Sequence, residues 1–164
     1  MSVTTAQHAE TETTTTTATR RRGVAAILAV VLLAIALAGC LPSDSQSFVD
    51  RTNSLRRSHG VAGLATHGTL TQKAEEWAQR MASTGRLEHS TLSAGLDSVG
   101  WTALGENVGY SSQTSDTYLT IHNAFVNSAG HYRNLVNPIY THMGVGVATD
   151  SSGRVWVAEV FARL

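Results

Sequence analysis

The sequence predicts an α+β domain in which helices pack on a small antiparallel sheet. Residues 70–84 and 116–126 space their apolar side chains as amphipathic helices do, whereas residues 143–161 have the pattern of a hairpin of strands. Because helices come first and strands last, the order favours an α+β arrangement over alternating β-α units. The chain of 164 residues, 42% hydrophobic and 15% charged, fits one domain preceded by an extension.

The extension has the composition of an export signal. Residues 1–19 are polar and rich in threonine, three arginines follow at 20–22, and an apolar run covers 24–38. That run is shorter than the roughly 20 residues that a membrane-spanning helix needs. We interpret residues 1–39 as a polar n-region and export signal, with the twin-arginine route and an uncleaved signal anchor as alternatives.

Cys40 is the only cysteine and lies directly behind the apolar run. The segment Leu37-Ala38-Gly39-Cys40 resembles a bacterial lipobox, which implies that Cys40 is lipidated and that residues 40–46 form its tether. We therefore expect the domain of residues 47–164 outside the cytoplasmic membrane, either lipid-anchored or secreted. With no second cysteine, this domain has no internal disulfide and depends on packing for its stability.

The first helix of the domain follows this tether. One face is formed by residues spaced four, three and four apart: Phe48, Thr52, Leu55 and His59. Asp44 or Ser45 is expected to cap its start, and Gly60 to end it.

The second helix covers residues 70–84 and has the stronger apolar stripe. Thr69 and Gln72 predict a capping box at its start, and Gly85 predicts a left-handed residue at its end. Trp77 lies on the stripe and is expected to anchor the core.

Residues 91–104 are irregular in pattern, and the third helix is predicted over 116–126 with Thr114 or Ser115 as its cap. A short helical turn is expected at 131–136, before Asn137-Pro138 ends it.

The chain closes with a hairpin whose strands are 143–149 and 154–161. Gly144 and Gly146 alternate with valines, so one face of the first strand is almost bare and lets a helix lie close.

Three polar segments carry the candidate chemistry. His131 follows a glycine and precedes a buried strand, Glu106 lies between two glycines, and His89 follows the second helix. We hypothesise that His89, Glu106 and His131 converge in one cleft.

The region from Phe48 to Phe161 resembles the CAP superfamily, which comprises cysteine-rich secretory proteins, antigen 5 and plant pathogenesis-related proteins with their bacterial SCP-like members. The likeness rests on five motifs in the right order: Ala74-Glu75-Glu76-Trp77-Ala78, His89-Ser90, Gly105-Glu106-Asn107, Asn127-Ser128-Ala129-Gly130-His131 and Met143-Gly144-Val145-Gly146-Val147. The resemblance implies a three-layer α-β-α sandwich, an exported location, and a cleft of histidines and glutamates that can hold a divalent metal such as zinc.

His89, Glu106 and His131 match three cleft residues of that family. The second glutamate of animal and plant members has no counterpart, since Phe125, Asn127 and Ser128 occupy its neighbourhood. The chain also lacks their disulfides and cysteine-rich tail, so the channel and toxin roles tied to that tail are not expected.

The three residues leave several chemistries open. His89 and His131 are the expected ligands of zinc or another divalent ion, whose bound water would make a hydrolytic site. Without a metal, Glu106 and His131 are the candidate catalytic acid and base. Alternatively, the histidines only fix the shape of the cleft by hydrogen bonding.

We prefer a binding module for a lipid, another apolar ligand or a glycan of the envelope. Lipid binding is implied by the resemblance alone. A metal-dependent hydrolase acting on envelope material or peptides is the alternative, and a purely structural envelope protein is the third. The net charge of zero gives no reason to expect nucleic acid, and no phosphate-binding Gly-x-x-x-x-Gly-Lys loop occurs.

The remaining polar and aromatic residues are assigned no catalytic role. Neither Ser90 nor Ser128 lies in a Gly-x-Ser-x-Gly elbow, and Glu159 is expected at an edge or in a hydrogen bond. Trp101 and Tyr110 are expected either at the mouth of the cleft or in the core. Four histidines match no cleft position: His59, His67, His122 and His142.

Overall fold

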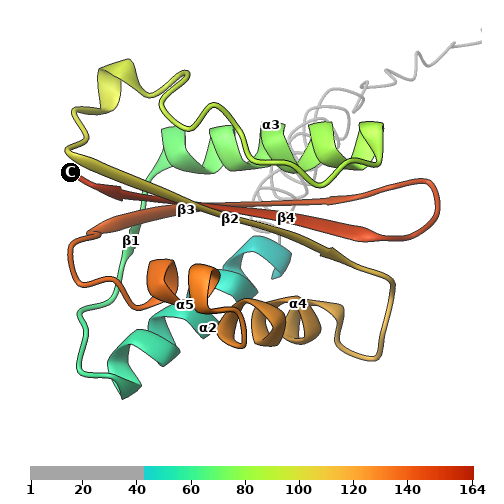
Figure 1. Cartoon of the computed structure of the whole chain (residues 1–164), viewed down its shortest axis with the longest axis horizontal. Coiled ribbons are helices and arrows are strands. Elements are labelled where there is room, and N and C mark those ends of the chain that lie inside the picture. The colour runs from blue at the N-terminus through green and yellow to red at the C-terminus, as the bar shows by residue number, and fades with distance from the viewer. Residues whose placement is uncertain (1–42) are drawn as a thin grey trace, which may run out of the picture. The chain divides into compact units, whose positions relative to one another are not determined.

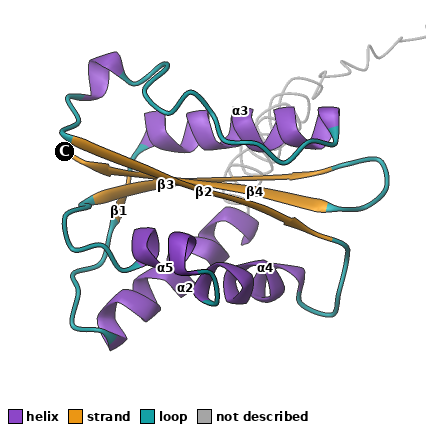
Figure 2. Cartoon of the chain, viewed as in Figure 1, coloured by secondary structure: helices purple, strands orange, loops and turns teal. Residues whose placement is uncertain are grey.

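The computed structural model describes residues 43–164; the predicted export signal and Cys40 lie outside them. In this range a four-stranded sheet lies between helix α3 (Gly68–Thr84) on one face and three helices on the other (Figure 1, Figure 2). The three helices are α2 (Ser43–Ser58), α4 (Thr117–Val126) and α5 (Ala129–Leu135). The predicted α+β fold with an α-β-α sandwich is confirmed. Of the helices described, none combines the length and apolar character needed to cross a membrane.

The sheet is mixed, with strand order β1-β3-β4-β2. Its members are β1 (Ala65–Thr66), β2 (Ala103–Ser111), β3 (His142–Thr149) and β4 (Val155–Arg163). Strand β4 runs antiparallel to β3, as expected for the hairpin, and also to β2, but β1 runs parallel to β3. Strand β1 was not predicted, because two residues that pair with a distant strand carry no pattern of their own.

Helix α3 packs on the strand face that the glycines leave bare. A Cβ atom at Gly144 would collide with the backbone of Leu70, and one at Gly146 with that of Ala74. This close approach, predicted from the glycine alternation, buries the apolar stripe of α3 on the sheet.

The two ends of α3 differ in how well the sequence predicts them. Gly85 has φ +66° and donates its N–H to Met81 O at 2.8 Å, as expected of a left-handed C-terminal residue. The predicted capping box is wrong: the N-cap is His67, which makes no side-chain capping bond, and Gln72 donates to Glu76 instead. Trp77 packs at the margin of the core and is half-buried.

The opposite layer begins earlier than expected, because α2 starts at Ser43 and so includes residues assigned to the tether. Helix α4 is capped by Asp116, whose Oδ1 accepts from Leu119 N at 2.8 Å, and neither Thr114 nor Ser115 is its cap.

A buried cation fixes α2 relative to α5. The fully buried guanidinium of Arg56 donates to four backbone carbonyls, those of Ala62, Leu135, Asn137 and Tyr140. Burial lowers the pKa of Arg56 below its usual value, since no carboxylate is among these hydrogen-bond partners. The end of α5, the helix that carries His131, is thereby held against α2.

Candidate functional site

The site is built on β2, which lies at the edge of the sheet next to β4. Glu106 pairs with Val160 and Asn107 with Glu159, and successive side chains of a strand point to opposite faces. Val160 belongs to the core beneath α3. Glu106 therefore faces the α3 layer, and Asn107 faces the layer of α2, α4 and α5.

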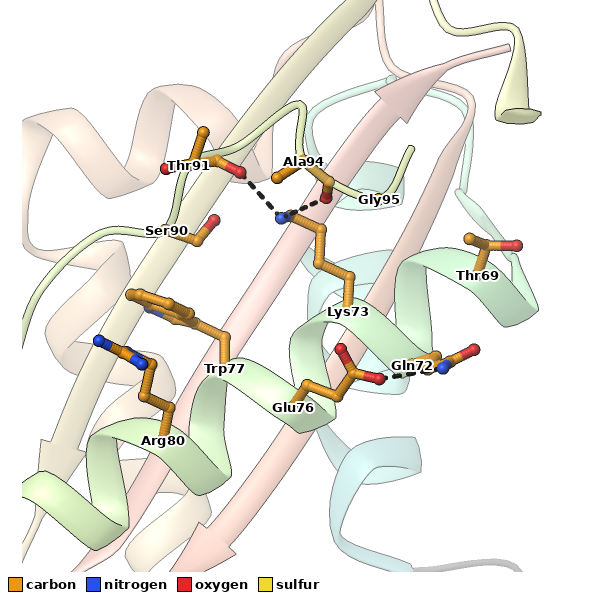
Figure 3. Close-up of a pocket in the computed structure, with 10 residues that line it drawn as sticks. All are labelled: Thr69, Gln72, Lys73, Glu76, Trp77, Arg80, Ser90, Thr91, Ala94 and Gly95. Atoms are coloured by element: carbon orange, nitrogen blue, oxygen red, sulfur yellow. Dashed lines mark hydrogen bonds between the residues drawn. The ribbon is translucent and has the colours of Figure 1, made fainter. Parts of the chain in front are cut away.

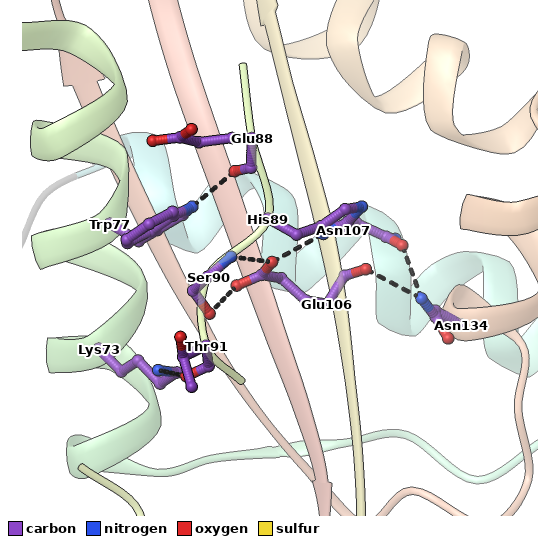
Figure 4. A network of polar contacts seen from close by, with 9 residues as sticks. All are labelled: Lys73, Trp77, Glu88, His89, Ser90, Thr91, Glu106, Asn107 and Asn134. Atoms are coloured by element: carbon purple, nitrogen blue, oxygen red, sulfur yellow. Dashed lines mark hydrogen bonds and ion pairs between the residues drawn. The ribbon is translucent and has the colours of Figure 1, made fainter. Parts of the chain in front are cut away.

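The chain that leaves α3 runs alongside β2 and brings His89 and Ser90 to Glu106 (Figure 4). The Glu106 carboxylate accepts three hydrogen bonds: from His89 Nδ1 at 2.7 Å, from Ser90 N at 3.0 Å and from Ser90 Oγ at 2.6 Å. Its side chain is only 3% exposed. These bonds compensate for the loss of water around a buried carboxylate.

The His89 ring is oriented by this carboxylate. Because an ionised carboxylate only accepts, Nδ1 of His89 must carry the proton, which leaves Nε2 as the lone-pair nitrogen of the neutral ring. The side chain of His89 is 63% exposed. Glu106 therefore positions a solvent-accessible imidazole and is not itself open to a substrate.

His131 lies in the first turn of α5. Its carbonyl accepts from Asn107 Nδ2 at 3.3 Å, and its ring lies against Phe125 with 4.9 Å between centroids. Its buried Nδ1 has no hydrogen-bond partner among the described residues. Burial lowers the pKa of His131, and the nearby His89 lowers it further, so the ring is neutral at neutral pH. Of the three residues predicted to converge, His89 and Glu106 are therefore in direct contact, and the convergence of His131 with them stays a prediction.

A network on the far face of β2 connects these segments and was missed from the sequence. Asn107 Nδ2 donates to Glu159 Oε2 at 3.0 Å, and Asn134 Nδ2 donates to Asn107 Oδ1 at 2.9 Å and to Glu106 O at 3.1 Å. Asn107 could have been found from the sequence, because it belongs to the Gly-Glu-Asn motif. Asn134 carried no signal, and Glu159 was expected either at an edge or in a hydrogen bond, with no partner named.

Glu159 is fully buried on the central strand β4, so of its two expected settings the hydrogen-bonded one is correct and the edge is not. Burial raises the pKa of Glu159 to about 7, and the bond from Asn107 opposes that shift. Thr52 also lowers this pKa, although its hydroxyl does not reach hydrogen-bond geometry. The carboxyl is therefore poised to lose its proton near neutrality.

The described residues offer few ligands for the expected metal. Residues 43–164 contain no group of three or more His, Cys, Asp or Glu side chains that could hold an ion. The expected ligands His89 and His131 supply one nitrogen each, whereas catalytic zinc sites take three protein ligands. The described residues therefore do not form such a site by themselves, and a bound metal stays a prediction.

The other singled-out residues lie elsewhere. His59 bonds Tyr132 Oη, His67 and His142 pack edge to face, and His122 is buried, which together with the charge of Arg51 lowers its pKa.

The two aromatic residues considered for the cleft mouth are both partly exposed. Tyr110 stacks on Trp156 with 4.6 Å between ring centroids, and Trp101 is 36% exposed. Neither packs in the core.

The comparisons with known proteins agree with this fold. The model of the cysteine-rich secretory protein family (CAP) matches residues 49–160. YkwD of Bacillus subtilis is 27% identical over 122 residues, which cover 70% of this chain and 46% of YkwD.

Two solved structures extend the likeness. An extracellular protein containing an SCP domain from Bacillus anthracis is 28% identical with a TM-score of 0.62, over 74% of this chain and 40% of that one. An outer surface protein of Borrelia burgdorferi is 16% identical with a TM-score of 0.65, over 74% and 93% respectively, and supports the fold alone. This chain spans less than half the length of both Bacillus relatives.

Proposed function

Because the chain belongs to the cysteine-rich secretory protein family (CAP), we propose that it is an extracytoplasmic binding domain for a lipid or another envelope ligand. In this proposal the ligand is held at the cleft of His89, Glu106 and His131, and a lipidated Cys40 anchors the domain to the membrane. The similar protein from Bacillus anthracis is extracellular, which supports this location.

One observation favours binding over catalysis. The Glu106 carboxylate already accepts three hydrogen bonds and is almost fully shielded from solvent. A general base must reach the proton that it removes, and a carboxylate with this surrounding does not. The exposed His89 ring and the neutral His131 ring remain to contact a ligand.

A metal-dependent hydrolase is the second candidate. Two imidazole nitrogens favour it. Because Nδ1 of His89 donates to Glu106, Nε2 of the neutral ring keeps its lone pair, and the buried Nδ1 of His131 has no hydrogen-bond partner among the described residues. The carboxylate that orients His89 resembles the outer-sphere partner found behind metal-bound histidines.

The test compares the full chain with its His89→Ala and His131→Ala variants. Metal content is measured after dialysis against zinc, turnover is assayed on peptidoglycan and peptides, and binding is measured to purified cell-wall fragments and to envelope lipid extract. We expect binding to the lipid extract that both substitutions weaken, and no turnover. Turnover that disappears together with the metal in both variants would contradict the binding function and favour the hydrolase.

A further inference from the structure

A recess lies between α3 and the loop of residues 90–95 (Figure 3). Its volume is about 650 Å³, within the usual range of ligand pockets. Of the cleft residues and their partners described above, only Ser90 lines this pocket. A ligand could therefore occupy it without touching His89 or His131.

The lining suits a hydroxyl-rich ligand better than a lipid. Seven of the ten lining residues have polar or charged side chains, and an apolar ligand would cover them without replacing their water. The one aromatic wall is Trp77, whose Nε1 donates to Glu88 O at 2.8 Å and so holds the indole in place. Such a rigid indole beside hydroxyl and amide groups can pack on the C–H face of a sugar ring.

The charges in the pocket favour an anionic group on that ligand. Lys73 Nζ donates to Thr91 O at 3.0 Å and to Ala94 O at 2.9 Å, which leaves one of its three N–H groups free. The guanidinium of Arg80 lies 5.4 Å from the centroid of the Trp77 ring. Against these two cations the lining offers a single carboxylate, Glu76, which already accepts from Gln72.

We propose that this pocket binds a saccharide that bears a carboxylate. Trp77 supplies the apolar wall, Gln72 and the lining hydroxyls meet the sugar hydroxyls, and Arg80 with Lys73 meets the carboxylate. This inference deepens the proposed binding function and rests on it for the extracytoplasmic setting, but it assigns the ligand to a different set of residues.

The test is calorimetric titration of the full chain with two disaccharides, one containing N-acetylmuramic acid and the other the neutral dimer of N-acetylglucosamine. The first is expected to bind more tightly. Arg80→Ala is expected to weaken its binding about tenfold or more, because a charge-assisted contact is lost. No binding of either disaccharide, or equal affinity for both, would overturn the proposal.

Arg86→Ala is the matched control. Arg80 and Arg86 both lie near the Glu88 carboxylate, at 3.9 and 3.8 Å, but only Arg80 lines the pocket. The control should leave the affinity within about twofold, so equal losses in the two variants would contradict a specific site. Since Arg80 is largely exposed, its replacement is not expected to prevent folding.

The His89→Ala variant separates this inference from the proposed function. It should weaken binding of the acidic disaccharide less than Arg80→Ala does. If it abolished that binding while Arg80→Ala did not, the saccharide would occupy the His/Glu cleft; the binding function would then stand and the pocket assignment would fall.

Discussion

At the scale of single residues, the two buried carboxyls of the site differ in their surroundings. Glu106 accepts three hydrogen bonds near the edge of the sheet, whereas Glu159 has one bond from Asn107 and an oxygen without a partner. An unpaired buried carboxylate is costly, so a carboxyl in this setting holds its proton to higher pH. The first carboxyl orients a histidine, and the second is expected to make the stability of the fold depend on pH.

Glu159→Gln is expected to remove that dependence. Burial raises the pKa of Glu159 from 4.5 to about 7, so the folded chain keeps a proton that the unfolded chain loses between these values. Its contribution to the free energy of unfolding is fully present below about pH 4.5 and is lost as the pH rises through about 7. At pH 8 the variant should be the more stable chain, by on the order of 3 kcal/mol.

The measurement is urea denaturation of both chains at pH 5 and pH 8. Glu76→Gln removes the same charge from the exposed surface of α3 and serves as control. It should leave the difference in the free energy of unfolding between pH 5 and pH 8 as it is in the native chain. A native chain more stable than Glu159→Gln at pH 8 would show that burial does not raise the pKa of Glu159.

At the scale of elements, the position of α3 depends on two glycines of β3. The helix backbone lies where a Cβ atom of residue 144 or 146 would be, and α3 delivers the chain directly to His89 and Ser90. Any shift of α3 would therefore move the two residues that hold the Glu106 carboxylate.

Gly144→Ala is expected to destabilise the fold by about 1–3 kcal/mol or more, because the added methyl group meets backbone that cannot rotate away. Thermal unfolding followed by circular dichroism measures the change. Gly130→Ala is the matched control: it lies in α5 with open space around it, and alanine favours helix there by up to about 1 kcal/mol. Similar losses in both variants would contradict the close packing of α3 on β3.

At the scale of the whole molecule, the sequence predicted the elements that carry their own pattern. The stripes of α3 and α4 and the alternation in β3 are local, so their existence was foreseen. What the sequence could not supply depends on partners far along the chain. Examples are β1, which exists only through β3, and Arg56, whose hydrogen-bond partners are carbonyls that folding brings to it.

The same distinction holds for the site. The residues in short motifs, His89 and Glu106, could be singled out, and the structure brings them within 2.7 Å of each other. The pairing of Asn107 with Glu159 is set by the register of β2 against β4, which no local pattern encodes. The cap of α4 was misjudged because Thr114, Ser115 and Asp116 are all good capping residues and only the folded helix selects one.

The membrane anchor is a prediction about the whole chain that lies outside the described residues. Mass spectrometry of the protein from its native host should find an N-terminus at a lipid-modified Cys40. Cys40→Ser should leave an unprocessed precursor or release the domain from the membrane fraction. An unmodified Cys40, or an N-terminus far downstream, would refute lipid anchoring.

The convergence of His89, Glu106 and His131 is tested most directly by an NMR titration of the His131 ring. Burial and the neighbouring His89 both lower its pKa, so His131 should titrate below its usual value of 6.5. In His89→Ala the pKa should rise without reaching that value, because burial remains, whereas His142→Ala should leave it unchanged. A His131 ring that titrates at or above 6.5, or one that does not respond to His89→Ala, would contradict a shared cleft.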